Sequence, residues 1–482
     1  MAEDALRRLA DRCLLPGFVG TEAPDWIRRR AAAGLGGVVL YGRNVESPEQ
    51  VATLTRTLHR ERPELLVGID EEGGDVTRLE ARTGSSYPGN LALGAGSSSE
   101  MTRLVAASMG AELAAAGIDL DLAPDADVNS NPDNPVIGVR SFGSDPTLVS
   151  EHVAAFVTGL QSSGVAACAK HFPGHGDTSV DSHLALPTVN DDPRSSGALE
   201  PFRAAITAGV RSVMTAHLLV PSLDSVPATL SRKILEDLLR SELGFDGLVI
   251  SDGIEMRAIA GSVGIVAGTV QAIAAGCDAI CIGGGLKTEA DHDLLRDGIV
   301  VAVREGRLAE SRLAAAAERV DRLAAWRRAH SAPAQAADPE IGLRAAVQGL
   351  GLDRPPKIGP NPVVVQFRAG ANIAVGSVPW GVTEHLAALG ATPTTLEFDQ
   401  PPVQVEDVLR TAAGRSLVLV VRNLHRHPWQ LEAVERLVAE RPDAVLVEMG
   451  LPALRPGGVG DWVRSHGASR ASGRAVAEAL LR

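Results

Sequence analysis

Eight short apolar segments, each followed by a segment with helical periodicity, limit the possible folds of this chain more than any other feature. The apolar segments are 13–18, 37–42, 65–70, 118–125, 165–172, 210–217, 246–252 and 277–283. Helical periodicity is clear at 48–62, 101–116, 147–163, 231–243 and 288–303. Continuous apolar runs are typical of strands buried on both faces, and their alternation with helices indicates a parallel sheet. Eight such units predict an α/β fold of the (β/α)8 TIM-like barrel type.

The character of the sequence changes after residue 325. Residues 327–342 are rich in alanine and proline, which is typical of a linker. Further apolar runs follow at 361–367, 372–377, 416–423 and 443–450, with helical segments at 427–440 and 473–481. This alternation predicts a smaller α/β sandwich domain. We therefore expect a catalytic barrel at 1–328, a linker at 329–345 and a C-terminal α/β sandwich domain at 346–482.

Composition and charge narrow the possible partners. The formal net charge of −13 argues against nucleic acid or an anionic membrane surface, because both require basic patches. The sequence shows no secretory signal pattern and no run of about 18 uncharged apolar residues. Its four cysteines form no CxxC pair, so neither a disulfide framework nor a zinc ribbon is indicated. We expect a cytoplasmic protein that binds a small molecule and needs no metal and no cofactor.

Polar residues end most of the eight apolar segments. In a (β/α)8 barrel the chemistry lies at the carboxyl ends of the strands. Helix capping or solvated loop charge accounts for only about two such residues in this set. We therefore expect an active site at this end of the barrel. The residues concerned are Arg43, Asp70, Asp125, Asp127, Lys170, His171, His217 and Asp252.

The segment 169–187 is the densest in titratable groups, and loops on a rigid scaffold are where catalytic residues concentrate. It contains Lys170, His171, His175, Asp177, Asp181 and His183. Asp181 and His183 are two residues apart, so a local turn can let the carboxylate hydrogen-bond the ring. Such a carboxylate tunes a histidine as a proton shuttle near neutral pH. The alternative is that Asp181 caps a turn and His183 faces solvent.

A second candidate lies in FDGLVISDGIEM, residues 245–256. Asp252 ends a strongly apolar segment and is followed by Gly253. A carboxylate at this position projects into the barrel mouth, and the glycine leaves room for a close ligand. The alternative is that Asp252 caps the helix that follows.

Together these motifs resemble glycoside hydrolase family 3, and more narrowly its NagZ-type β-N-acetylglucosaminidases in their two-domain form. The pattern KHFPGHGDTSVDSH, followed downstream by a strand ending in SD-x-x-x-M, carries the resemblance. It extends to the segments 36–44, 68–79, 122–129, 134–143 and 213–218, and so covers nearly all of the sequence up to the last apolar segment of the barrel.

The resemblance implies roles for individual residues. Asp252 would be the nucleophile that forms a covalent glycosyl intermediate, and His183, paired with Asp181, would be the acid/base. Retaining glycosidases need these two functions on either side of the scissile bond. The residues that would bind the sugar are Asp70, Arg140, Lys170 and His171, with His217 lining the same pocket.

The implied activity is that of a retaining exo-β-N-acetylglucosaminidase. It would remove terminal non-reducing N-acetylglucosamine from chitin oligosaccharides or from peptidoglycan fragments. Its partner would be this small carbohydrate, and the protein would be a monomer or a weak homodimer. Because the DSH motif supplies the acid/base, the C-terminal domain need not take part in catalysis, and we expect it to stabilise the barrel.

The sequence departs from the family pattern at three positions. Glu71 and Asp75 stand where glutamine and arginine are common, and Gly253 stands where aspartate or alanine usually follows the nucleophile. We expect the two acids to make the rim of the site more acidic. That would disfavour a muramic acid or peptide carboxylate in the leaving-group site and favour neutral chitin fragments.

Other functions stay open at this point. Within the family these are a β-N-acetylglucosaminide phosphorylase, since a neutral imidazole repels phosphate less than glutamate would, or a β-glucosidase. Lys170 could instead form a Schiff base in a lyase, and a sugar-binding module without turnover is a further alternative. A metal site would combine His171, His175 and His183 with Asp177 or Asp181, although Pro173 and Gly174 prevent the helix that usually aligns such ligands.

Overall fold

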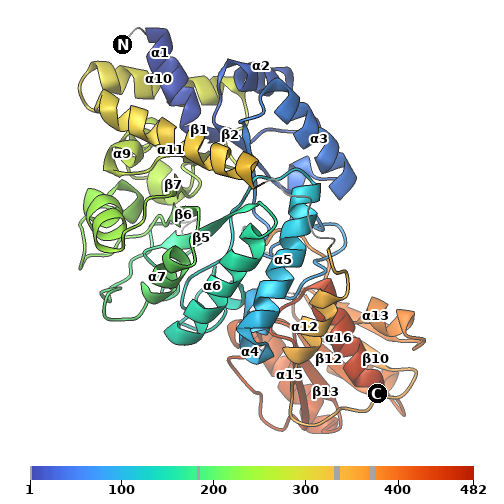
Figure 1. The fold of residues 1–482 in the computed structure, drawn as a ribbon. Helices are drawn as coiled ribbons and strands as arrows, with labels where there is room; N and C mark the ends of the chain where they lie inside the picture. Colours follow the sequence, from blue (N-terminus) through green and yellow to red (C-terminus); the bar gives the residue numbers. More distant parts are fainter. Residues whose placement is uncertain (1–2, 182–184, 331–336, 369–374) are drawn as a thin grey trace. The chain divides into compact units, whose positions relative to one another are not determined.

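The computed structural model describes residues 3–181, 185–330, 337–368 and 375–482 (Figure 1). Contacts divide the chain into two compact units. The first unit comprises Met1–Glu71, Ala106–Ile137 and Ser144–Ala337, and the second comprises Glu72–Val105, Gly138–Gly143 and Asp338–Arg482. The second unit thus takes two short segments from the range in which we predicted the barrel. The division at 1–328, 329–345 and 346–482 itself stays a prediction.

Eight parallel strands build the first unit, and every one lies within a predicted apolar segment. They are β1 (Leu14–Pro16), β2 (Gly37–Leu40), β3 (Leu66–Ile69), β4 (Leu120–Asp121), β5 (Ala166–Phe172), β6 (Ser212–Thr215), β7 (Leu248–Ser251) and β8 (Ile280–Ile282). Strands β2 to β7 form one sheet in sequence order, and β1 pairs with β8. A bridge between Ile250 and Ala279 connects β7 to β8. The predicted TIM-like barrel architecture is confirmed.

The strands are short and apolar because both of their faces are buried. Leu15, Val39, Leu66, Met214 and Ile250, each from a different strand, share one buried cluster. The register sets Leu40 opposite Ile69 and Thr215 opposite Ser251. The residues that follow these strands therefore emerge at the same end of the sheet.

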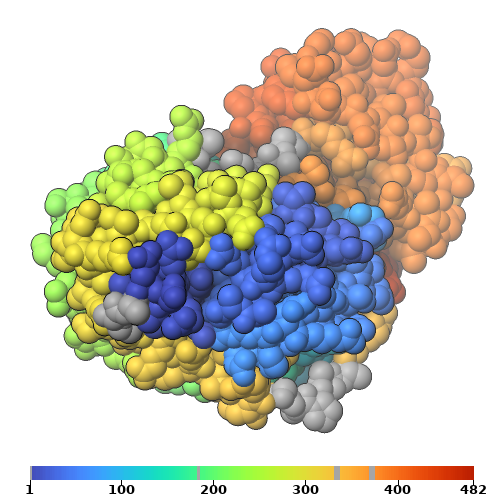
Figure 2. All heavy atoms as spheres, turned by 90° about the horizontal axis from the view of Figure 1, so that it is seen from above, coloured from blue at the N-terminus to red at the C-terminus, as the bar shows by residue number. Residues whose placement is uncertain are grey.

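Helices follow the strands as the periodicity predicted. The predicted segments correspond to α3 (Pro48–Glu61), α5 (Ser99–Ala115), α6 (Pro146–Gln161), the π-helix η4 (Lys233–Glu242) and α10 (Glu289–Arg304). The other helices of this unit are α1 (Glu3–Arg12), α2 (Asp25–Ala33), α7 (Glu200–Thr207), α8 (Arg257–Ala260), α9 (Ile265–Ala275) and α11 (Glu310–Ala329). Ser47 and Asp145 cap α3 and α6, each followed by a proline. Helix α1 lies against α10 and α11 at the surface (dark blue against yellow in Figure 2).

The second unit contains a six-stranded sheet in the order β11-β10-β12-β13-β14-β9, in which only β9 is antiparallel. Its strands are β9 (Gly351–Leu352), β10 (Val363–Phe367), β11 (Thr394–Phe398), β12 (Leu417–Val421), β13 (Val445–Glu448) and β14 (Asp461–Arg464). Its helices are α4 (Asn90–Gly96), α12 (Ile341–Gln348), α13 (Thr383–Ala388), α14 (Val405–Thr411), α15 (Pro428–Glu440) and α16 (Arg470–Leu481). Val363 and Val365 enter one hydrophobic cluster, while Val364 enters another. Both faces of the sheet are thus covered, which confirms the predicted α/β sandwich.

The strand prediction in this unit is partly wrong. Strands β10, β12 and β13 lie where we predicted them, but 375–377 form no strand, and 372–374 lie outside the described residues. We did not predict β11, β14 or the two-residue β9. Strand β11 is an edge strand whose residues are only half-buried, so it lacks the continuous apolar run of a central strand. Within the described residues, no helix is long and apolar enough to cross a membrane.

Candidate active site

Asp252 directly follows β7, at the carboxyl end of the barrel strands. Its backbone N–H donates to the carbonyl of Thr215 at the end of β6, with a donor–acceptor distance of 3.3 Å. Its Oδ1 accepts a hydrogen bond from the N–H of Gly253 at 2.7 Å. The residue is half-buried. Asp252 is therefore held by its neighbours and still accessible to a ligand, as a nucleophile must be.

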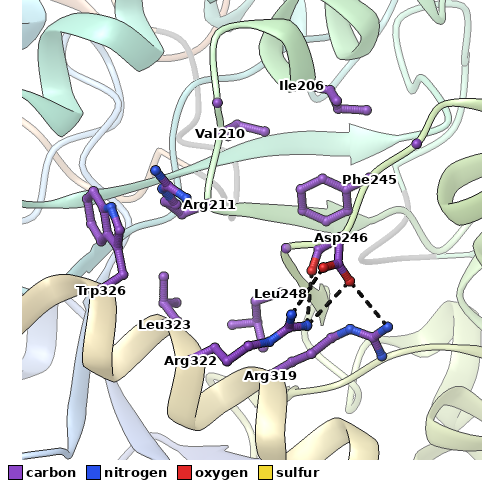
Figure 3. A pocket seen from close by; sticks show the side chains of 13 residues that line it. Ile206, Val210, Arg211, Phe245, Asp246, Leu248, Arg319, Arg322, Leu323 and Trp326 are labelled. Carbon is purple, nitrogen blue, oxygen red and sulfur yellow. Dashed lines mark hydrogen bonds and ion pairs between the residues drawn. The ribbon is translucent and has the colours of Figure 1, made fainter.

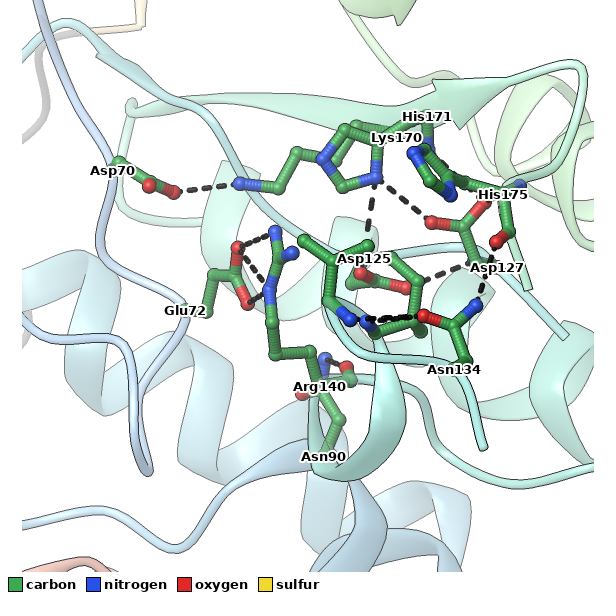
Figure 4. Close-up of polar contacts among 12 residues, drawn as sticks. Asp70, Glu72, Asn90, Asp125, Asp127, Asn134, Arg140, Lys170, His171 and His175 are labelled. Carbon is green, nitrogen blue, oxygen red and sulfur yellow. Dashed lines mark hydrogen bonds and ion pairs between the residues drawn. The ribbon is translucent and has the colours of Figure 1, made fainter. Parts of the chain in front are cut away.

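Lys170 and Asp70 join the ends of β5 and β3. The Lys170 Nζ lies 2.6 Å from Asp70 Oδ1, and the lysine side chain is 3% exposed while the aspartate side chain is 21% exposed (Figure 4). An ammonium group in such a pair is held in its charged form, whereas a Schiff-base lysine must react as a neutral amine. The pair therefore favours a sugar-binding role over the lyase alternative.

Asp127 organises the loop that follows β5. Its Oδ2 accepts a hydrogen bond from His171 Nδ1 at 2.8 Å, and its Oδ1 accepts the backbone N–H groups of His171 and His175 at 3.3 and 2.6 Å. Burial acts to raise the pKa of Asp127, but the contacts with His171 and His175 outweigh burial and lower it. The ionised carboxylate only accepts hydrogen bonds, so the proton of His171 is placed on Nδ1. The orientation of the His171 ring is thereby fixed.

His175 makes hydrogen bonds that hold this loop. Its Nδ1 lies 2.8 Å from Thr178 Oγ1, its carbonyl accepts a hydrogen bond from Asn134 Nδ2, and burial lowers its pKa to about 4. The ring is therefore neutral at physiological pH. It lies edge-on to His171, with ring centroids 6.0 Å apart. These contacts give His175 a structural role beside the site.

His217 contacts Gly253, the residue that follows Asp252. Its Nε2 is 3.0 Å from the carbonyl of Gly253, its Nδ1 is 2.8 Å from Thr229 Oγ1, and the residue is fully buried. A carbonyl only accepts hydrogen bonds, so Nε2 carries the proton. His217 thus holds the carbonyl of Gly253, the residue that follows Asp252. Its direct contact with sugar stays a prediction.

Arg140 belongs to the second unit, at the end of the short helix η2 (Gly138–Arg140). It makes a bidentate ion pair with Glu72, with Nη2–Oε1 at 2.7 Å and Nε–Oε2 at 2.9 Å (Figure 4). Both residues are buried, and Asn90 Nδ2 donates to the Arg140 carbonyl. Such a fork is a rigid arrangement of donors.

The expected acidic rim is wrong. Glu71 is 4% exposed and Asp75 is 5% exposed. Within the second unit, Asp75 pairs with Arg422 and accepts the backbone N–H of Ala468 at 2.7 Å. Because both acids are buried and the charge of Asp75 is neutralised, they do not provide the surface charge from which we expected a preference for neutral chitin fragments.

The predicted acid/base pair is only partly described. Asp181 is half-buried, and its carbonyl accepts a hydrogen bond from the N–H of Ala185 at 3.1 Å. His183 lies outside the described residues. The pairing of Asp181 with His183 therefore stays a prediction.

One group of described residues has metal-like spacing, and it differs from the set considered in the sequence. Asp125, Asp127 and His171 each place a potential ligand atom within 4.8 Å of the others. In this structure His171 Nδ1 already donates to Asp127, which accounts for the contact without an ion. The alternative set included His175, whose Nδ1 is engaged by Thr178.

The sequence interpretation missed the partners of the predicted residues. Asp127 was grouped with the other strand-end residues but was given no role, and Glu72 was not singled out at all. Asp127 had a usable signal, because it lies two residues after Asp125 at the end of an apolar segment. The pairing of Glu72 with Arg140 joins residues 68 positions apart, and no local pattern reveals it.

Comparison with known proteins identifies related glycoside hydrolases. The model of the glycosyl hydrolase family 3 N-terminal domain matches residues 21–323. A beta-hexosaminidase of Thiobacillus denitrificans is 39% identical over 278 residues, which is 55% of this chain and 76% of that protein. Beta-hexosaminidase A of Pseudoalteromonas piscicida is 37% identical over 281 residues, which is 53% of this chain but only 47% of that longer protein.

Solved structures extend the similarity to both units. A glycoside hydrolase family 3 beta-N-acetylglucosaminidase from Paenibacillus sp. str. FPU-7 matches with a TM-score of 0.89 and 34% identity, over 98% of this chain and 96% of that one. The beta-glucoside phosphorylase BglX, at 17% identity and a TM-score of 0.76, shares the fold. From its barrel, its strand-end residues and these relatives, we conclude that the chain belongs to glycosyl hydrolase family 3 and is a glycoside hydrolase.

Proposed function

We propose that this enzyme is a retaining exo-β-N-acetylglucosaminidase that hydrolyses terminal non-reducing N-acetylglucosamine from chitin oligosaccharides or peptidoglycan fragments. The observation that carries the proposal is the accessible Asp252 carboxylate at the end of β7, in the same barrel as the Lys170–Asp70 and His171–Asp127 pairs. The names of the relatives, beta-hexosaminidase and beta-N-acetylglucosaminidase, favour N-acetylglucosamine as the sugar.

In the first step, a carboxylate oxygen of Asp252 attacks the anomeric carbon of the terminal sugar. The bond to the glycosidic oxygen breaks, its electron pair stays on that oxygen, and His183 supplies the proton, so that the remaining saccharide leaves as an alcohol. In the second step, His183 removes a proton from water, and the hydroxide formed attacks the anomeric carbon. The ester to Asp252 breaks, and the sugar is released with its original anomeric configuration.

The residues around Asp252 would divide the remaining work. Asp70, Lys170 and His171 present acceptor and donor groups suited to sugar hydroxyls. The Asp70–Lys170 ion pair and the contact of His171 with Asp127 fix those groups before the substrate arrives. His217 holds the carbonyl of Gly253, the residue after Asp252. Hydroxyl binding by Arg140, and orientation of His183 by Asp181, complete the proposed set.

A comparison of p-nitrophenyl β-N-acetylglucosaminide with the β-glucoside tests the sugar. We expect kcat/KM to be at least about tenfold higher for the first substrate, since the site must recognise the acetamido group. NMR of the first product should show the β-anomer, and the product in phosphate buffer should be free sugar. A first product of the α-anomer would refute retention, equal rates would refute the sugar assignment, and a sugar 1-phosphate would indicate a phosphorylase.

The acid/base role of His183 has its own signature. His183→Ala should lose about 10²- to 10⁴-fold in rate on chitobiose. It should lose much less on the first step with a dinitrophenyl leaving group, because that group departs without protonation. An equal loss on both substrates would contradict the role of His183 as the general acid.

A further inference from the structure

A cavity lies at the amino ends of strands β6 and β7, away from Asp252. It has a volume of about 310 Å³, which is within the range of small-ligand sites, and its walls come from the segments before β6 and β7 and from one face of α11 (Figure 3). Asp252 follows β7 at its other end. A strand of four residues spans about 13 Å, so this cavity is separate from the catalytic groups.

The floor of the cavity is apolar. Val210, Phe245, Leu248 and Leu323 line it, and each is at most 5% exposed. The ring of Phe245 faces the space opposite Trp326 (Figure 3). This floor suits a flat hydrocarbon or aromatic body.

The rim carries more positive than negative charge. Arg211, Arg319 and Arg322 line the cavity, and Asp246 is the only acid among the lining residues. Asp246 pairs with Arg322 at 3.1 Å, while Arg319 reaches both Asp246 and the buried Asp278. The charge of Asp278 is already offset further, by Arg240 and Arg312. In a chain of net charge −13, this is a local reversal of sign.

Arg211 differs from Arg319 and Arg322, which both pair with Asp246. Over the described parts of the chain, no carboxylate lies within ion-pair distance of its guanidinium, which instead lies 4.9 Å from the centroid of the Trp326 ring. Two donors of residues that line the cavity also lack acceptors. Trp326 Nε1 and Arg319 Nε are buried N–H groups without a hydrogen-bond partner in the described structure. Buried donors of this kind cost free energy until an acceptor reaches them.

We propose that this cavity, which we call the arginine pocket, binds a small organic anion with a flat apolar body, such as an aromatic carboxylate. The carboxylate pairs with Arg211 and adds acceptors to a wall that carries two unpartnered donors, and the ring lies on the floor formed by Phe245 and Leu323. Arg322, which pairs with Asp246, lies on the same rim and adds further N–H donors. The proposal does not depend on which sugar the catalytic end cleaves.

Isothermal titration calorimetry of the full chain with 2-naphthoate, and with neutral 2-naphthamide as its matched analogue, tests this site. Saturating N-acetylglucosamine is present so that the catalytic end is occupied. We expect saturable 1:1 binding of the naphthoate, at least about tenfold weaker binding of the amide, and weakening of the naphthoate with added salt. Equal binding of the two compounds, or no binding of the acid, overturns the proposal.

Arg211→Met locates the binding, because it keeps most of the side-chain volume and removes the charge. We expect at least a tenfold weaker naphthoate affinity, with the same loss in Trp326→Leu. Arg232→Met, at an exposed arginine of the same unit, is the control and should bind as the wild type does. If Arg211→Met unfolds at a lower temperature, Arg322→Met provides the second measurement. Unchanged affinity in a folded variant of either rim arginine contradicts the proposal.

Discussion

Strands β7 and β13 can be compared because each is a parallel strand with an acidic residue at its carboxyl end. Asp252 and Gly253 follow β7, while Glu448 is the last residue of β13 and Gly450 follows it by two positions. After β7, Asp252 is half-buried, and its Oδ1 accepts the backbone N–H of Gly253 at 2.7 Å. At the end of β13, Glu448 is 2% exposed and accepts the N–H groups of Asn423, Leu424 and Gly450 at 2.8, 3.1 and 2.7 Å.

The difference shows what separates a reactive acid from a structural one. The carboxylate of Glu448 accepts three backbone N–H groups and so holds two loops together. Because the residue is buried, it is not accessible to a ligand. Burial raises its pKa to about 7, against the opposing effect of the same three N–H groups. Asp252 also ends an apolar strand, but it is half-buried rather than fully buried. The two acids share a position at a strand end and differ in exposure, and this difference makes Asp252 the candidate for the proposed chemistry.

The largest expected effect comes from Asp252→Asn. The amide cannot act as an anionic nucleophile, so we expect kcat on p-nitrophenyl β-N-acetylglucosaminide to fall by about 10²- to 10⁴-fold with the unfolding temperature unchanged. Asp237→Asn, at an exposed aspartate of the same unit, is the matched control and should retain full activity. Near-full activity of Asp252→Asn would remove the basis of the proposed mechanism.

Much of the barrel could be predicted from sequence because its strands are buried on both faces. The run of β7 is apolar up to its last residue, Ser251, and the charged residue that follows marks the carboxyl end of the strand. Asp252 was therefore placed correctly at the carboxyl end of β7, while Lys170 and His171 lie in the last residues of β5. Their roles in the site stay predictions. In the second unit, the half-buried β11 shows no such run and was missed.

Burial of individual charges could not be predicted. Glu71 and Asp75 lie in an acidic, glycine-rich segment that is typical of a solvated loop, yet both are buried. The partner of Asp75 is Arg422, which is 347 positions away in the sequence. Local patterns carry no information about a contact of this kind, so the expected acidic rim failed for a reason that only the folded chain reveals.

The next largest effect is expected at Asp127, which acts on the site through His171. In Asp127→Asn the anionic acceptor of His171 Nδ1–H is lost, so the ring is free to change tautomer and orientation. We expect a loss of up to about 10²-fold in kcat/KM, with a shifted pH–rate profile. Asp177→Asn changes an exposed acid of the same loop and is the control. A normal pH profile in Asp127→Asn would show that His171 does not need this partner.

Glu448→Gln should affect stability and leave catalysis almost unchanged. The folded protein holds the Glu448 proton more tightly than the unfolded chain, whose pKa is near 4.5. This contribution to stability is therefore complete below about pH 4.5 and is lost as the pH rises through about 7. In urea, we expect the wild type to lose about 1 to 3 kcal/mol relative to Glu448→Gln between pH 5 and pH 8.

Glu435→Gln, at an exposed glutamate of α15, is the control and should follow the wild type at both pH values. Activity of Glu448→Gln should stay within about twofold of the wild type. A catalytic loss comparable to that of Asp252→Asn would mean that the two strand-end acids do not differ in the way their exposure indicates.

The smallest effect is expected from Gly253→Ala, which tests whether ligand access to the half-buried Asp252 depends on the glycine that follows it. A Cβ at this position would lie 3.5 Å from the Glu255 carboxylate oxygens, an ordinary contact, so the fold should tolerate it within about 0.5 kcal/mol. We expect kcat/KM within about threefold of the wild type. Gly176→Ala is the contrasting variant, because its Cβ would lie 1.7 Å from the carbonyl oxygen of Val128 and must displace the His175 loop. A loss above about tenfold in a stable Gly253→Ala would instead place the substrate directly against residue 253, and the glycine would then be part of the binding surface.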